Sequence, residues 1–142
     1  MTLEEIHAAI PHRDPFLLVD EIVELDDSRI LCRKTFGGDE FWYRGHYPDF
    51  PLTPGVLLCE AGMQAGAILI SRFIDDETKG IPVATRLNEV RFKRMVRPGE
   101  TIDIEVRLTE RLQDAFFLHA KITVDGKVAV RFQFACALAE RE

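Results

Sequence analysis

His46 and Glu60 are the residues of this chain whose types and spacing best suit catalysis. Imidazole is the natural general base near neutral pH, and a carboxyl group shielded from water can hold a proton for a leaving group. Glu60 lies in the run 56–70, which is otherwise apolar or glycine except for Gln64. Burying an ionised carboxylate costs several kcal/mol unless it is paired, so an acid at this position needs a reason. The simplest reason is a hydrogen bond from a neighbouring backbone donor.

The apolar run around Glu60 predicts a long buried helix, because a helix that is apolar all round is normally covered on every side. With about 3.6 residues per turn, Glu60 and Gln64 project from the same face. Thr53 is expected to be the N-cap and Pro54 the first helical residue, which places the helix start directly after the loop that carries His46. No membrane span is expected, because a span needs about 20 apolar residues and this run is shorter and contains an acid.

The chain length favours a single domain, residues 1–142, with one core. The 18 Lys and Arg residues against 24 Asp and Glu give a formal charge of −6, which argues against nucleic acid as a general partner. No signal peptide is expected, because the first ten residues are acidic and contain no long apolar core. Three cysteines lie in apolar runs without metal-binding spacing, so we expect reduced core thiols of a cytoplasmic protein and no zinc site. They are Cys32, Cys59 and Cys136.

Outside this helix the pattern is mostly one of strands. A short first helix is expected before Pro11, begun by a capping box of Thr2 and Glu5. Strands are expected over 15–25, 29–36, 83–94 with an interruption near Asn88, 101–108, 116–124 and 127–138. Turns are expected at 26–28, 98–99, 113–114 and 125–126, the last being the strongest hairpin signal. About six antiparallel strands curved around one buried central helix form an α+β fold of the hotdog type.

The loop 37–52 is too rich in aromatic residues for a solvated linker, and a long loop in a small domain is usually functional or packed over something. We expect Trp42, Tyr43 and Phe50 to pack in the core or in a dimer contact, with lining of a substrate tunnel as the second possibility.

Several motifs together resemble the FabZ-type beta-hydroxyacyl-acyl-carrier-protein dehydratases, over nearly the whole chain. They are Pro11-His12-Arg13, Pro15 to Asp20, Gly45 to Leu57 followed by Glu60-Ala61 and Gln64, Arg91 to Arg94, Pro98-Gly99 and Val124 to Lys127. In that family the histidine and the acid stand fourteen positions apart, as His46 and Glu60 do here.

The resemblance implies dehydration of a (3R)-3-hydroxyacyl thioester on acyl carrier protein to the trans-2-enoyl thioester, in fatty acid biosynthesis or a related acyl pathway, without a metal or organic cofactor. His46 as base and Glu60 as acid fit an elimination of water beta to a thioester. The backbone N–H of Gly55, with Val56 beside it, is expected to bind the developing enolate oxygen at the helix start. Gln64 is expected either to support Glu60 or simply to bond a neighbouring loop.

Three positions depart from the family pattern without removing a catalytic group. Asp49 stands where a small residue is usual, Thr53 where methionine is usual, and Thr85-Arg86 where the family has a small Ala-Gly pair. These departures bear on the acyl chain length and favour a specialised paralog.

The resemblance also implies a homodimer with a continuous sheet, often three dimers together, in which His46 of one chain meets Glu60 of its partner. Acyl carrier proteins are acidic, so docking on a chain of charge −6 requires a local basic patch. The densest candidate contains Arg86, Arg91, Lys93, Arg94 and Arg97 against the single acid Glu89. Strand alternation places Arg91 and Lys93 on one face and Arg94 on the other, and a solvated strand face is the simpler explanation.

The main alternative function is hydrolysis, because hotdog thioesterases use an acid on the same helix but often lack the loop histidine. The presence of His46 favours the dehydratase over the thioesterase, and the pair of His46 and Glu60 argues against a non-enzymatic acyl-binding scaffold. The other histidines are expected to be structural or on the surface: His7, His12 and His119.

Overall fold

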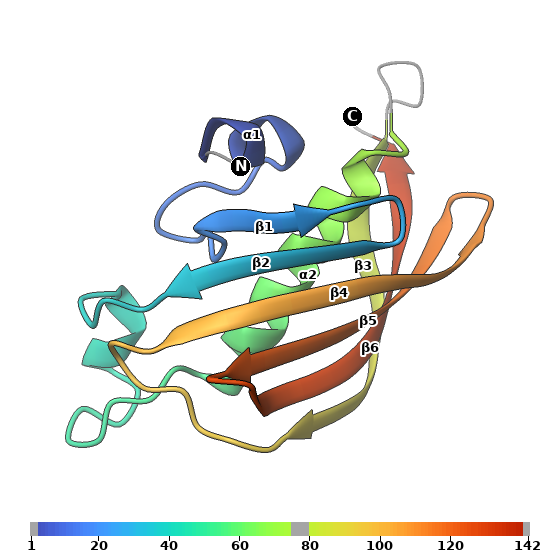
Figure 1. Cartoon of the computed structure of the whole chain (residues 1–142). Helices are drawn as coiled ribbons and strands as arrows, with labels where there is room; N and C mark the ends of the chain where they lie inside the picture. The colour runs from blue at the N-terminus through green and yellow to red at the C-terminus, as the bar shows by residue number, and fades with distance from the viewer. Residues whose placement is uncertain (1–2, 75–79, 141–142) are drawn as a thin grey trace.

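The computed structural model describes residues 3–74 and 80–140, which form six strands, two α-helices and one short 3-10 helix (Figure 1). The elements are α1 (Leu3–Ala9), β1 (Glu21–Leu25), β2 (Arg29–Thr35), η1 (Phe41–Arg44), α2 (Gly55–Ser71), β3 (Gly80–Phe92), β4 (Thr101–Leu112), β5 (Ala115–Val124) and β6 (Lys127–Glu140).

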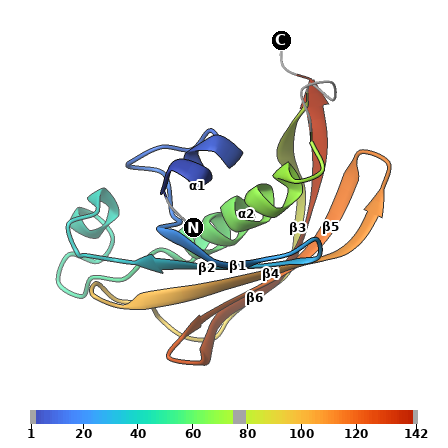
Figure 2. The same ribbon diagram turned by 45° about the horizontal axis from the view of Figure 1, so that its top comes forward.

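The six strands form one antiparallel sheet in the order β1-β2-β4-β5-β6-β3. The sheet curves around α2, which lies against its concave side (Figure 2). Strand alternation explains this arrangement, because every second residue of β5 is buried beneath the helix. The predicted α+β hotdog fold is confirmed.

Two glycines of α2 allow the helix to lie close to the sheet. A Cβ atom at Gly62 would lie 2.7 Å from Cζ of Phe132, and one at Gly66 would lie 2.6 Å from Cζ of Phe134. Both rings are buried in the core, so they have little room to move away. Glycine at these positions therefore sets the distance between α2 and β6.

The expected first strand over residues 15–25 is too long, since β1 begins at Glu21. Before it, the carbonyl of Arg13 accepts hydrogen bonds from the N–H groups of Phe16 and Leu17, which makes a turn. The Phe16 carbonyl and the Leu18 N–H bond the side chain of Gln64 instead of a neighbouring strand. Backbone groups satisfied in this way cannot enter the sheet ladder.

The expected start of the central helix is also wrong in detail. The helix begins at Gly55, and Pro54 is its N-cap residue without a side-chain capping bond. The Thr53 hydroxyl instead bonds the Tyr43 hydroxyl at 2.5 Å, while its N–H donates to the carbonyl of Val96 at 2.8 Å. Thr53 therefore joins η1 to the connection between β3 and β4. In the first helix, Thr2 of the expected capping box lies outside the described residues.

The predicted hairpin turn and the burial of two aromatic residues of the loop are confirmed. The 125–126 turn has φ of 50° at Asp125 and 79° at Gly126, the left-handed backbone that tight hairpins require. The aromatic loop forms η1, which buries Trp42 and Tyr43, whereas Phe50 is largely exposed.

The three cysteines are buried and unpaired. Burial raises the pKa of Cys32 to about 12 and the pKa values of Cys59 and Cys136 to about 11, so these thiols stay protonated. Neither described helix is long and apolar enough to cross a membrane.

Candidate active site

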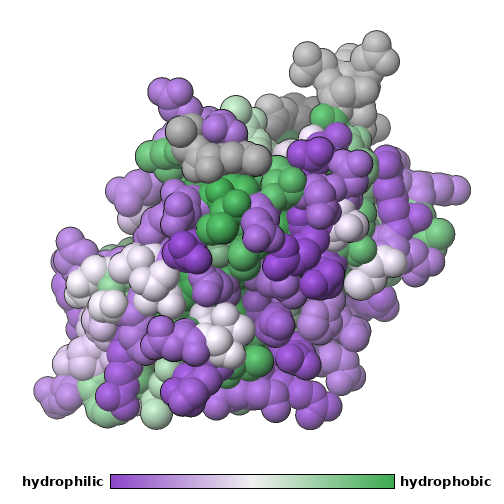
Figure 3. All heavy atoms as spheres, in the orientation of Figure 1, coloured by the Kyte–Doolittle hydropathy of each residue, from purple (hydrophilic) through white to green (hydrophobic). Residues whose placement is uncertain are grey.

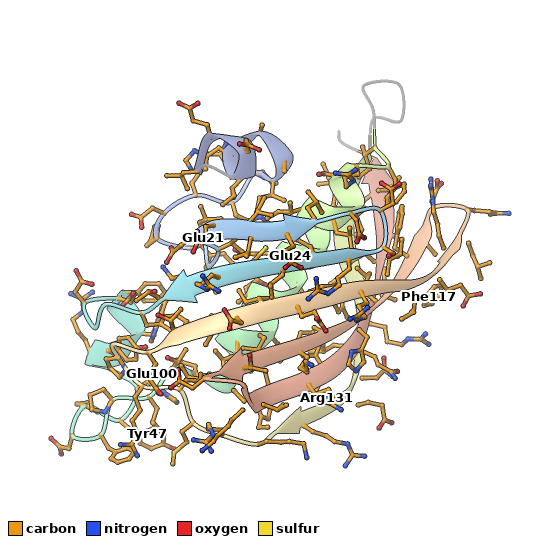
Figure 4. The ribbon with its side chains drawn as sticks, viewed as in Figure 1. Glu21, Glu24, Tyr47, Glu100, Phe117 and Arg131 are labelled. Carbon is orange, nitrogen blue, oxygen red and sulfur yellow. The ribbon has the colours of Figure 1, made fainter. Side chains whose placement is uncertain are left out.

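His46 lies in the loop between η1 and α2, close to Tyr47, which is labelled in Figure 4. Its backbone N–H donates to the carbonyl of Trp42 at 2.9 Å, and its ring Nδ1 lies 3.0 Å from the carbonyl oxygen of Leu52. A carbonyl oxygen can only accept, so the proton of the neutral ring is on Nδ1. Nε2 then carries the lone pair and makes no hydrogen bond in the described part of the chain, as a general base requires.

A cavity of about 570 Å³ adjoins His46 at the start of α2. Its walls are mainly apolar and include Val56, Phe92 and Met95, all of which are exposed in the single chain. The first N–H groups of a helix have no partner within it, so those of Gly55 and Val56 are available as donors here.

Gly55 cannot be replaced by a larger residue without moving the cavity wall. A Cβ atom at this position would lie 2.6 Å from Cε1 of Phe92, a contact that real Cβ atoms do not make. Packing of Phe92 against the bare backbone thus places an apolar ring directly beside the donors of the helix start.

Glu60 lies one to two turns further along α2 and is held by Gln64. The Gln64 Nε2 donates to Oε2 of Glu60 at 3.0 Å and to the Phe16 carbonyl at 2.8 Å, while its Oε1 accepts from the Leu18 N–H at 2.7 Å. Because a backbone N–H can only donate, the Leu18 bond fixes which end of the Gln64 amide faces Glu60. Gln64 is only 1% exposed, so these bonds are shielded from water.

The expectation that Glu60 is a carboxylate inside a closed core needs correction. Its side chain is 23% exposed, because the sheet covers one side of α2 and leaves the other side partly open (Figure 2). Val56, the second residue of α2, is 72% exposed. The helix is therefore buried on most, but not all, of its circumference.

His12 is the neighbour of Glu60 that the sequence prediction missed. Its Nε2 lies 3.7 Å from Oε2 of Glu60, although the residues are far apart in the chain. The motif Pro11-His12-Arg13 draws attention to His12 in the sequence. Hydrophobic periodicity, however, does not indicate that the imidazole ring faces α2. Arg13 orders this segment by donating to the carbonyls of Ile10 at 2.8 Å, His12 at 2.7 Å and His7 at 3.0 Å.

Within the described residues, no hydrogen bond or ion pair joins His46 to Glu60, and Glu60 does not line the cavity beside His46. The single chain therefore brings His46 together with Gly55 and Val56, and it brings Glu60 together with Gln64 and His12. It does not bring the two groups together.

The basic segment after β3 differs from its prediction, because the strand ends at Phe92 and strand alternation does not extend to Lys93. The N–H groups of Lys93 and Arg94 both donate to the carbonyl of Ala129, and both residues line the cavity. Arg91 lies 3.6 Å from Glu89, and the Arg97 guanidinium covers the ring of Phe50 at 4.7 Å.

The outer face of the sheet carries the remaining polar groups. Hydrophilic residues predominate on this face in Figure 3, and Figure 4 labels Arg131 on it. His119 lies there, partly buried, and burial lowers its pKa, with Arg131 as a further cause. This position on the face opposite to α2 agrees with a structural role.

Comparison with known proteins assigns the family. A model of the FabA-like domain matches residues 10–133. The chain belongs to the FabA-like domain family. It is 42% identical over 130 residues to the 3-hydroxyacyl-(acyl-carrier-protein) dehydratase FabZ of Clostridium perfringens, an alignment that covers 91% of this chain and 92% of that protein. It is 38% identical over 138 residues to the FabZ of Staphylococcus aureus, covering 96% and 93%. Within the FabA-like domain family, the chain is therefore of the FabZ type.

Solved structures agree on the fold. A dehydratase heterocomplex from Xenorhabdus doucetiae superposes with a TM-score of 0.81 at 18% identity, covering 96% of this chain and 91% of that chain. A mutant thioesterase from Pseudomonas aeruginosa gives 0.72 at 17% identity, covering 96% and 93%. Because dehydratases and thioesterases share this fold, the fold alone does not select the reaction.

Gln64 yields a prediction about stability. Gln64→Leu leaves the Leu18 N–H and the Phe16 carbonyl without their partner, and each such loss costs ~1–3 kcal/mol. We expect a loss of a few kcal/mol in the free energy of unfolding, measured by urea denaturation. The matched control is Gln133→Leu, which removes an exposed amide that accepts from the side chain of Asn88, and it should change stability by less than about 0.5 kcal/mol. Equal effects of the two changes would contradict the bridging role of Gln64.

Proposed function

We propose that the chain dehydrates (3R)-3-hydroxyacyl thioesters carried on acyl carrier protein to trans-2-enoyl thioesters, with His46 as base and Glu60 as acid. The observation that supports this assignment of roles is the hydrogen bond from Nδ1 of His46 to the Leu52 carbonyl, which leaves Nε2 as a proton acceptor beside an apolar cavity. The family membership supports the reaction.

In this mechanism, Nε2 of His46 removes a proton from the α carbon, and the electron pair moves onto the thioester oxygen. The N–H groups of Gly55 and Val56 donate to that oxygen, where the negative charge develops. The enolate then re-forms the carbonyl, the α–β double bond forms and the β carbon–oxygen bond breaks. Glu60 protonates the departing hydroxyl, which leaves as water.

The proton that Glu60 delivers is assigned to Oε1. The other oxygen, Oε2, already accepts from Nε2 of Gln64, and this donor cannot turn away because its own amide oxygen is tied to Leu18. In the described part of the chain, Oε1 makes no hydrogen bond. An oxygen without a competing donor is the one able to carry the transferred proton.

A complete site requires two chains in this proposal. Strand β3 lies at an edge of the sheet, with a neighbour on one side among the described strands, and long unpaired edges favour pairing with another chain. Val56, Phe92 and Met95 at the cavity are exposed apolar groups that a partner would cover. We infer a homodimer, alone or as one of three in a trimer of dimers, in which His46 faces Glu60 of the partner subunit. A cytoplasmic location belongs to the same proposal and is supported by the unpaired cysteines.

The first functional prediction tests the two reacting groups. His46→Ala and Glu60→Gln should each lower turnover by about a hundredfold or more, because a positioned acid or base supplies ~10²–10⁴ in rate. Enoyl product and free thiol are measured together on (3R)-3-hydroxyacyl thioesters of graded chain length. His119→Ala, which changes a histidine on the outer sheet face, should retain full turnover. Near wild-type dehydration by either site variant would exclude these roles, and thiol release without enoyl product would indicate a thioesterase.

The second functional prediction tests the shared site. Mixing His46→Ala with Glu60→Gln protein under subunit exchange should restore activity, because a mixed dimer contains one site with both native groups. The measurement is turnover against mixing ratio, with each variant alone as control. A monomeric mass in solution with full activity would contradict the proposal.

Docking of the carrier protein is assigned to the basic groups at the cavity mouth. Lys93 and Arg94 line the cavity, and Arg91 precedes them at the end of β3. All three are exposed, so they can attract an acidic carrier despite the net charge of −6. Arg97 lies beside Phe50 in the same loop region and is the fourth docking candidate.

Charge reversal tests the docking surface. Lys93→Glu or Arg91→Glu should raise KM for carrier-bound substrate and leave small thioester analogues nearly unaffected, because such rim charges act mainly on encounter. The wild-type difference between substrates should shrink as salt rises, because the screening length is already about 8 Å at physiological strength. Arg107→Glu makes the same charge change on the outer sheet face and serves as control. Equal losses on both substrate types would refute the docking assignment.

A further inference from the structure

Two side chains converge on a single oxygen of Glu60. The Gln64 Nε2 bonds Oε2 at 3.0 Å, and the His12 Nε2 lies 3.7 Å from the same atom. The second distance exceeds that of a hydrogen bond, but it is short for an electrostatic contact between groups that are only 28% and 23% exposed. The other oxygen of the carboxylate, Oε1, is left to the reaction.

The burial of the His12 ring indicates where its proton lies. Its Nδ1 is buried and has no hydrogen-bond partner within the described residues. A buried N–H without an acceptor is costly, whereas a ring nitrogen without a proton leaves no donor unsatisfied. The favoured tautomer therefore carries its proton on Nε2, which is the nitrogen that faces Glu60. Stacking against Phe16, with the ring centroids 6.4 Å apart and 20° between the planes, keeps the imidazole in this position.

The same short segment holds both neighbours of Glu60. His12 belongs to it, and the Phe16 carbonyl and the Leu18 N–H within it bind both ends of the Gln64 amide. Arg13 donates three further hydrogen bonds, to the carbonyls of His7, Ile10 and His12. These bonds fix the path of the chain between α1 and His12. The segment 12–18 therefore holds the Glu60 carboxylate in place through His12 and Gln64.

We propose that His12 is a positioning residue, which together with Gln64 holds Glu60 by Oε2 and keeps Oε1 turned toward the substrate. The Nε2–H dipole also stabilises the carboxylate that remains after Glu60 has given up its proton. This inference rests on the proposed role of Glu60 as the acid. It adds His12 to the proposed site as a residue that acts through Glu60, without contacting the substrate or His46.

A pair of substitutions separates this role from simple packing. His12→Met keeps similar bulk but has no N–H, whereas His12→Gln retains a donor near the position of Nε2. We expect His12→Met to lower kcat by about tenfold with KM changed by less than about twofold, and His12→Gln to recover most of kcat. His7→Ala removes a histidine of α1 whose side chain makes no hydrogen bond within the described residues, and it should leave kcat unchanged. The melting temperature is measured for all variants.

A double-mutant cycle tests whether His12 acts through Glu60. In the Glu60→Gln background, His12→Met should cause no further loss, because the group that it positions is already gone. An undiminished tenfold loss in that background would overturn the proposal, as would equal kcat for His12→Met and His12→Gln. If kcat fell in proportion to the melting temperature in both His12→Met and His12→Gln, His12 would have a packing role and the proposal would also be overturned. Full activity of Glu60→Gln alone would instead refute the proposed function, so the two failures are distinguishable.

Discussion

The buried amide of Gln64 is the interaction on which the arrangement around Glu60 depends. It makes three hydrogen bonds: one to the carboxylate of Glu60 on the same helix, and two to the backbone of Phe16 and Leu18, which are far away in the chain. Gln64 itself is buried, and its loss would leave the Leu18 N–H and the Phe16 carbonyl without this partner. The same side chain that attaches the segment before β1 to the central helix therefore orients the Glu60 carboxylate. These contacts explain why a polar residue is accepted in an otherwise apolar helix.

The curved sheet supplies a second constraint, because it fixes α2 without covering it completely. Gly62 and Gly66 let the helix approach the rings of Phe132 and Phe134, so α2 is held firmly against the concave side. At its N-terminus the helix leaves the sheet's cover, and Gly55 meets Phe92 in the wall of the cavity. A rigid helix whose first N–H groups face a cavity is a preorganised donor site, and preorganised donors do not have to reorient when charge develops. The fold thus positions the donors before any substrate arrives.

The sequence predicts what is local and misses what depends on distant contacts. The hairpins, the six strands and the buried helix follow from alternation, turn residues and apolar length, all of which can be read within a few positions. The overlong first strand, the assignment of Thr53 as N-cap and the omission of His12 have a common cause. In each case the deciding partner lies outside the local window: Gln64, Tyr43 and Glu60, respectively. The pairing of His46 with Glu60 stays a prediction that rests on the family resemblance, because periodicity carries no such long-range information. The hydrogen bonds that link Glu60, Gln64 and the backbone before β1 could be identified only from the structure.

The separation of His46 from Glu60 within one chain follows from the geometry of a single helix on a single sheet. His46 lies beside the start of α2, and Glu60 projects further along a helix whose core-facing side is occupied by glycine and alanine packed on aromatic rings. The partly exposed Glu60 projects away from this side, toward the part of α2 that the sheet leaves open. His46 is held by the loop, on the cavity side of the helix start. Two groups presented in different directions by one chain can act on one substrate when a second copy brings its own open face alongside. The exposed apolar wall formed by Val56 and Phe92 is suited to that contact, because covering it would exclude water from the N–H groups to which the proposed mechanism assigns the enolate oxygen.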